Sequence, residues 1–135
     1  MKYLTGSCNC GKVEIKIPDD FELMGNCHCK ECRKFSGGDY AVVGGLDSSK
    51  FEFVRGEDLV TYYPKSEETD LAFCSCCGSS LFSRKNSVHK HMVRLGILDD
   101  VPSSKPSFHI FTGEKAPWNE INDDLAQFDT RPPAK

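Results

Sequence analysis

The sequence contains no long run of apolar residues. No segment approaches the roughly 18 consecutive apolar residues that a membrane-spanning helix needs. The first residues, 1–7 (MKYLTGS), also lack the apolar core of an export signal. We therefore expect a cytoplasmic protein with no membrane partner.

The sequence also lacks blocks of charge of one sign. Its 17 basic and 20 acidic residues are scattered, and the formal net charge is −3. A protein that binds the nucleic-acid backbone carries a basic patch, so we expect no nucleic-acid partner. With 135 residues and no internal repeat, the chain is long enough to bury one core. We predict a single domain over residues 1–129 and a frayed tail at residues 130–135.

The pattern of apolar residues predicts a mostly β fold. Residues 12–17 alternate polar and apolar side chains, which is typical of a half-buried strand. Further strand candidates, separated by turn residues, are residues 40–43, 50–54, 59–63, 71–73, 81–84, 92–98 and 108–111. A short helical turn is expected at residues 33–38, where two glycines end it. Prolines after Asp99 predict an extended C-terminal arm, laid over the sheets and pinned by Trp118 and Phe128.

Three of the eight cysteines fall within six residues. Cys27, Cys29 and Cys32 have the spacing C-x-C-x-x-C, and three thiols cannot all pair as disulfides. In a reducing compartment, clustered cysteines are better explained as metal ligands. Zinc with three protein ligands keeps a fourth coordination position open, which is the usual arrangement for catalytic zinc. These residues are therefore the candidate reactive centre.

Two further cysteine pairs are each followed directly by a glycine. They are Cys8-x-Cys10-Gly11 and Cys74-x-x-Cys77-Gly78. Glycine permits a tight turn in which backbone N–H groups point back at the sulfurs. The two pairs together predict a closed four-cysteine zinc site that joins the first strand to the middle of the sheet.

The remaining cysteine and the histidines receive simpler interpretations. Cys76 lies between two predicted ligands, so its side chain should point away as a small buried or half-buried apolar group. His28 should likewise point outward. We predict that none of the other histidines is a ligand; they are His89, His91 and His109. One alternative stays open, in which Cys76, His28 or another side chain closes the three-cysteine cluster into an inert four-ligand site.

The order and spacing of the cysteine clusters resemble a known family. The segments that carry the resemblance are residues 6–11, 27–37, 73–81, 108–111 and 116–118. They are similar to the glutathione-dependent formaldehyde-activating family, which also includes the centromere protein V domain. The resemblance implies a β-tent of antiparallel sheets like that of Mss4, stapled by the four-cysteine zinc. It also implies a catalytic zinc at the three-cysteine cluster and a glutathione site beside it.

The resemblance implies a carbon–sulfur lyase that forms S-hydroxymethylglutathione from glutathione and formaldehyde. We expect the two glutathione carboxylates to contact residues near the three cysteines, namely Lys30, Arg33, Lys34, Ser36 and Gly37. A solvated basic edge and an ordinary loop are the alternatives for these residues. Two other functions stay open: a non-catalytic glutathione or thiol carrier, and a structural zinc module that binds proteins. The three-ligand zinc is expected to be the weaker of the two and to be lost more readily.

Overall fold

The computed structural model describes residues 2–133, and the chain folds mostly into strands. The strands are β1 (Tyr3–Ser7), β2 (Glu14–Pro18), β3 (Leu23–Cys27), β4 (Ala41–Asp47), β5 (Glu52–Arg55), β6 (Val60–Pro64), β7 (Thr69–Cys74), β8 (Ser80–Lys85), β9 (Lys90–Arg94), β10 (Phe108–Ile110) and β11 (Ala126–Gln127). The helix α1 covers Lys30–Ser36, and short 3-10 turns are η1 (Ser48–Lys50), η2 (Glu57–Leu59), η3 (Leu95–Ile97) and η4 (Thr112–Glu114). Within the described residues, no helix combines the length and apolar character needed to cross a bilayer.

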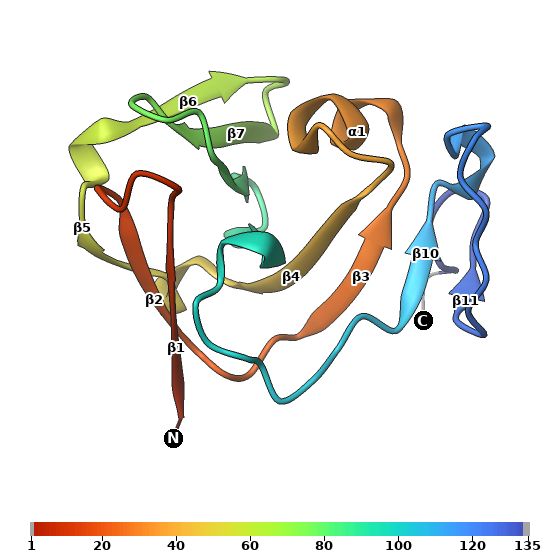
Figure 1. Ribbon diagram of the computed structural model, residues 1–135, viewed down its shortest axis with the longest axis horizontal. Coiled ribbons are helices and arrows are strands. Elements are labelled where there is room, and N and C mark those ends of the chain that lie inside the picture. Colours follow the sequence, from red (N-terminus) through yellow and green to blue (C-terminus); the bar gives the residue numbers. More distant parts are fainter. Residues whose placement is uncertain (1, 134–135) are drawn as a thin grey trace.

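The strands form two sheets (Figure 1). The small sheet has the order β1-β2-β5, and the large sheet has the order β11-β10-β3-β4-β9-β8-β7-β6. The prediction of a mostly β fold is confirmed. Most strand pairs are antiparallel, as predicted, and the sheet is mixed only at one edge, where β10 runs parallel to both β3 and β11. The C-terminal arm reaches that edge through a long connection and enters it in the same direction as β3.

Three strands were missing from the sequence prediction: β1, β3 and the two-residue β11. β1 contains Gly6, and β3 contains Gly25 and Asn26, residue types with low strand propensity. Both strands form because their backbones pair with neighbours, β1 with β2 and β3 with β4. The predicted strand at residues 92–98 is too long, since β9 ends at Arg94 and the chain turns through η3.

The large sheet has two different faces. On one face, Val93 packs with Leu4 and Ile15 of the small sheet, and Phe82 packs against Phe53 of β5, so that this face forms the core. Successive side chains of a strand point to opposite faces. Ser83 and Met92, which follow and precede those core residues on β8 and β9, therefore lie opposite each other on the second face. This alternation leaves the second face free to carry a site.

The C-terminal arm does not lie over the sheets as predicted. It extends the large sheet at its edge as β10 and β11, at the side of the molecule where Figure 1 shows the C-terminus. Phe128 holds the arm through its backbone N–H, which donates to the carbonyl of His109 at 2.9 Å. Trp118 stays 72% exposed, and its indole N–H donates to the Asp39 carboxylate at 2.6 Å. Trp118 therefore holds the arm by a polar contact and not by burial.

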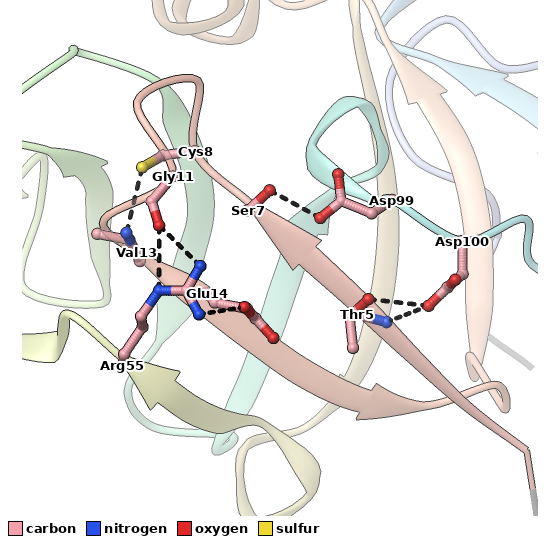
Figure 2. A network of polar contacts seen from close by, with 9 residues as sticks. All are labelled: Thr5, Ser7, Cys8, Gly11, Val13, Glu14, Arg55, Asp99 and Asp100. Carbon is pink, nitrogen blue, oxygen red and sulfur yellow. Dashed lines mark hydrogen bonds and ion pairs between the residues drawn. The ribbon is translucent and has the colours of Figure 1, made fainter.

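The start of the arm is fixed to β1 by two carboxylates, as Figure 2 shows. The Asp100 carboxylate accepts from both the backbone N–H and the hydroxyl of Thr5, at 2.7 and 2.9 Å. The Asp99 carboxylate accepts from the Ser7 hydroxyl at 2.7 Å. The predicted frayed tail covers residues 130–135. Its first residue, Thr130, accepts a backbone hydrogen bond from Phe111, and residues 134–135 lie outside the described part.

His91 is a buried titratable group in the core, and its burial should make the folding stability depend on pH. Its ring is 8% exposed, stacks on Phe82 with ring centroids 4.6 Å apart, and is bonded to the Ser48 hydroxyl at 2.8 Å. Burial lowers the pKa of His91 from 6.5 to about 4. The unfolded chain therefore takes up a proton at His91 at a higher pH than the folded chain does, and stability falls as the pH is lowered through this window.

We expect the titration of His91 to cost on the order of 2 kcal/mol of folding free energy between pH 7 and pH 5. His91→Phe keeps a ring against Phe82 but removes the proton site, so its stability should fall less over this range. Urea unfolding of both proteins, loaded equally with metal, measures the difference. Parallel stability curves for the two proteins would contradict the prediction.

Candidate functional site

The structure brings together the four cysteines that the sequence assigned to a closed site. The sulfur atoms of Cys8, Cys10, Cys74 and Cys77 all lie within 4.8 Å of one another. Four sulfurs about 2.3 Å from a tetrahedral metal would be about 3.8 Å apart. The separations are 3.5 Å from Cys8 to Cys10 and 3.9 Å from Cys10 to Cys74. This cluster could therefore hold a metal ion.

Two glycine turns shape the four-cysteine cluster. Gly11 and Gly78 have φ angles of 78° and 77°, a region that favours glycine. Their N–H groups donate to the carbonyls of Cys8 and Cys74, at 3.0 and 2.8 Å. The N–H of Val13 donates to the Cys8 sulfur at 3.3 Å. Both halves of the cluster thus use the same kind of turn, as the sequence predicted.

Arg55 clamps the first of these turns (Figure 2). Two nitrogens of its guanidinium, Nε and Nη2, donate to the Gly11 carbonyl at 3.1 and 3.0 Å. The third, Nη1, pairs with the Glu14 carboxylate at 2.6 Å. The turn that carries Cys8 and Cys10 is thereby tied to β2 and β5.

The second cluster lies where β3 passes into α1. The sulfurs of Cys27, Cys29 and Cys32 are also within 4.8 Å of one another, and this cluster too could hold a metal ion. Cys29 is the residue that caps the helix, and its sulfur accepts the N–H of Cys32 at 3.3 Å. The helix therefore begins at Lys30, three residues before the predicted turn, and it ends at Gly37 as expected.

Backbone pairing on both sides positions Cys27. This residue ends β3, opposite Ala41 of β4 on one side and Ile110 of β10 on the other. The next residue, His28, donates its N–H to the Ile110 carbonyl at 3.0 Å. The C-terminal arm, through β10, thus helps to hold the first cysteine of the cluster.

Without a metal, the three thiols share their protons unequally. Hydrogen bonds from the Cys27 and Cys32 thiols lower the pKa of Cys29 far below its ordinary value. The bond with Cys29 is also the main reason that the pKa of Cys27 is raised. The cluster therefore favours a thiolate at Cys29, and a thiolate is the form of cysteine that ligates a metal.

A cavity of about 550 Å³ opens beside the three cysteines. Its floor is the second face of the large sheet, and its walls come from the first turn of α1 and from the C-terminal arm. The lining residues are Cys27, Cys29, Lys30, Glu31, Cys32, Val43, Lys65, Leu71, Ser83, Lys85, Met92, Arg94, Ile110, Phe111, Glu114 and Arg131. A space of this size can hold a small organic ligand together with a second small molecule.

The charged residues that line this cavity are mostly basic. Five of the lining residues are lysine or arginine and two are glutamate. The glutamates already have partners: Glu31 pairs with Lys65 at 2.5 Å, and Glu114 accepts the backbone N–H of Lys30 at 3.1 Å. The cavity is therefore suited to an anionic ligand.

Arg94 faces the cysteines from the sheet. Its side chain is bonded to the Met92 carbonyl at 2.9 Å and to the Ser83 hydroxyl at 2.8 Å, and the residue is only 7% exposed. Burial lowers the pKa of Arg94, and the charges of the three cysteines oppose that effect. Within residues 2–133 the guanidinium forms no ion pair with a carboxylate. The cysteine cluster is the negative charge that compensates it.

The predicted glutathione contacts do not all reach this cavity. Lys30 lines it, since only the first turn of α1 borders the cavity. Lys34, Ser36 and Gly37 line a different hollow of about 500 Å³. Arg33 lines neither space, and its guanidinium lies 5.9 Å from the Trp118 ring centroid. Proximity in sequence to the cysteines was not enough to place these four residues at the cavity.

Two predicted side-chain positions are wrong. His28 does not point outward: it is fully buried, and its Nε2 lies 2.8 Å from Nδ1 of His109, whose Nε2 is 3.0 Å from the Asp123 carboxylate. Cys76 is exposed instead of buried, because the tight turn directs it to the surface. In the described residues, neither of them joins the three-cysteine group, so nothing closes it into a four-ligand site.

The sequence analysis missed several cavity residues. They are Lys65, Lys85, Arg94, Phe111 and Arg131. Lys85 and Arg94 carry a weak signal, since each stands two positions from another lining residue on the same strand. Phe111 belongs to a segment that carries the family resemblance but was given no role at the site. Lys65 and Arg131 lie in connections, and nothing in their local sequence marks them.

Comparison with known proteins identifies the family. A profile of the family described as "Glutathione-dependent formaldehyde-activating enzyme" matches residues 3–114. The chain belongs to this family. The formaldehyde-activating family profile covers both cysteine clusters but ends before the last part of the C-terminal arm.

Two individual proteins are similar to this family member. A Talaromyces marneffei protein named "Putative glutathione-dependent formaldehyde-activating enzyme" is 27% identical over 84 residues. The match spans 61% of this chain and 45% of that protein, so this chain corresponds to about half of the relative's length. A Rhodobacter sphaeroides protein of known crystal structure has a TM-score of 0.61 at 25% identity, covering 76% of this chain and 97% of that one.

We predict that the hydrogen bonds from Arg55 to Gly11 slow the loss of metal from the four-cysteine cluster. Arg55→Met removes both donors to the Gly11 carbonyl, so we expect Zn²⁺ at this cluster to be lost to a chelator about fivefold faster, equivalent to about 1 kcal/mol. The control Glu14→Gln removes the ion pair but keeps the two bonds to Gly11. Equal rates of metal loss from Arg55→Met and the control would contradict the role of the clamp.

We predict that the positive charge of Arg94 strengthens metal binding at the three-cysteine cluster. Arg94→Met leaves the negative sulfurs without their buried counter-charge, so we expect Zn²⁺ affinity there to fall about tenfold, or about 1.4 kcal/mol. The affinity of the four-cysteine cluster should not change. Chelator competition resolves the two sites, and Arg84→Met serves as the control because Arg84 pairs with Asp70 instead of facing the cysteines. An unchanged affinity in Arg94→Met would remove this role.

Proposed function

We propose that this protein forms S-hydroxymethylglutathione from glutathione and formaldehyde, a reaction of the carbon–sulfur lyase type. The reactive zinc would be held by Cys27, Cys29 and Cys32, and a structural zinc by the four-cysteine cluster. One observation carries the proposal: a group of three sulfurs opens directly into a basic cavity of about 550 Å³. Membership of the formaldehyde-activating family supports this choice of thiol and aldehyde.

The donor atoms of both clusters fit zinc. Thiolates are soft ligands that suit zinc, and four-sulfur sites are typically structural, whereas three protein ligands leave one position for substrate. All eight cysteines are free. This supports a reducing compartment such as the cytoplasm.

The reaction is an addition that needs no oxidant or reductant. When bound, zinc would lower the pKa of the glutathione thiol and hold its sulfur as the thiolate. The sulfur lone pair forms the new bond to the formaldehyde carbon, and the carbonyl π electrons move to oxygen. That oxygen takes up the proton that the thiol lost. The basic side chains of the cavity, Lys30 among them, supply N–H donors for the developing negative charge.

Ionising the thiol explains only a small part of any acceleration. A thiol of pKa about 8.5 is roughly 3% ionised at pH 7, so complete ionisation gains about 30-fold. A lower pKa also makes the thiolate less nucleophilic. With a Brønsted slope of about 0.4–0.5, the intrinsic nucleophilicity falls about tenfold, which cancels most of the gain from ionisation. Most of the catalysis must come from holding the aldehyde against the sulfur. The cavity beside the cysteines is the space in which the aldehyde would be held.

The proposal predicts separate outcomes for two cysteine variants. In Cys29→Ser we expect one zinc to be lost and the adduct-forming rate to fall to background, because an essential ligand is missing. Cys76→Ser is the matched control, since Cys76 is exposed and belongs to neither cluster. Exchange NMR of glutathione and formaldehyde measures the rate, and zinc content is measured on the same samples. Full activity in Cys29→Ser with one zinc would contradict the proposal.

The same measurement separates the two other functions considered for this chain. Broadening of the glutathione signals without faster exchange would indicate a thiol carrier. Two bound zincs with no effect on glutathione would indicate a structural module. The open side of the three-cysteine cluster favours a function in which a ligand enters.

A further inference from the structure

Three basic side chains gather in the cavity where the C-terminal arm meets the large sheet. They are Lys65, Lys85 and Arg131. Lys85 is half-buried, and its ammonium donates to the Thr69 hydroxyl at 3.0 Å. Burial is the main cause that lowers the pKa of Lys85, and the positive charges of Lys65 and Arg131 lower it further. The three charges are therefore close enough to repel one another.

These charges are only partly neutralised by the protein. Lys65 pairs with Glu31. In the part of the chain that the structure describes, neither Lys85 nor Arg131 forms an ion pair. Lysine has three N–H donors and arginine has five, so both side chains keep donors free for a ligand. Three like charges brought together in a cavity with only one carboxylate partner among the described residues favour the binding of an anion.

The backbone holds Arg131 in this place. The N–H of Phe111 donates to the Thr130 carbonyl at 2.8 Å, and the Arg131 guanidinium lies over the Phe111 ring, 5.5 Å from its centroid. Gly113 allows the segment that follows β10 to approach the segment around Asp129 closely, because a Cβ atom at position 113 would be 2.8 Å from the Asp129 carboxylate. Phe111 has a φ of 55°, which is rare for an aromatic residue and is sustained by these surrounding bonds.

We infer that Arg131, together with Lys85 and Lys65, forms a carboxylate-binding end of the cavity, and that the C-terminal arm thereby selects thiols that carry carboxylates. This inference rests on the proposed function, in which the sulfur end of the same ligand reaches the three cysteines. The planar guanidinium of Arg131 can bind a carboxylate with two parallel hydrogen bonds. Arg131 lies beyond residue 114, where the family match ends.

The test uses S-methylglutathione, whose blocked sulfur cannot ionise, so that binding depends on the rest of the molecule. Titration calorimetry with the zinc-loaded full chain should show binding that weakens about tenfold in Arg131→Met, since a charge-assisted contact is lost. Lys105→Met is the matched control, because it removes one positive charge from an exposed position on the same arm. The control should bind like the unchanged protein. The dimethyl ester of S-methylglutathione should bind at least tenfold more weakly than the free acid.

Two results would overturn the inference. One is equal affinity of Arg131→Met and Lys105→Met, and the other is equal affinity for the acid and its ester. Arg131 is exposed, so loss of folding is not expected in its variant, and a thermal unfolding curve checks this. The outcome is independent of turnover: an inactive protein that binds S-methylglutathione through Arg131 would refute the proposed reaction but retain the carboxylate site.

Discussion

The rest of the structure depends on one constraint, which is that negatively charged sulfurs must be held close together. Thiolates repel one another, so each must be fixed by its backbone and compensated by positive charge. The fold does this at the three-cysteine cluster with different elements. β10 pairs with the end of β3 at Cys27, the start of α1 orients Cys29 and Cys32, and Arg94 brings a buried positive charge from β9.

The alternation of side chains along the strands lets one sheet serve both as core and as cavity floor. On β8, Phe82 faces the small sheet and Ser83 faces the cavity; on β9, Val93 and Met92 do the same. The core therefore fixes the register that places the cavity residues. A shift of one residue in β9 would move Arg94 away from the cysteines and into the apolar layer.

The cysteine clusters could be predicted from sequence because their geometry is mostly local. Short spacings and the following glycines carry the information, and the structure groups the seven cysteines as expected. Arg131 could not be predicted, since its place depends on how a remote arm pairs with the rest of the chain. Lys34 shows the converse limit: it is two residues from Cys32 yet lines another hollow. The strands β1 and β3 were missed because pairing outweighed their weak local propensity.

The C-terminal arm connects the two ends of the cavity. Its strand β10 pairs with Cys27 of the three-cysteine cluster, and the next residue, Phe111, lies under Arg131 at the proposed carboxylate site. In the proposed function, this one short segment would set the distance between the sulfur and the carboxylate of the ligand. Edge strands that leave backbone groups unpaired are prone to non-specific pairing. By pairing with β3, the arm covers that edge and leaves the two-residue β11 at this end of the sheet, and the same arm would carry the proposed carboxylate site.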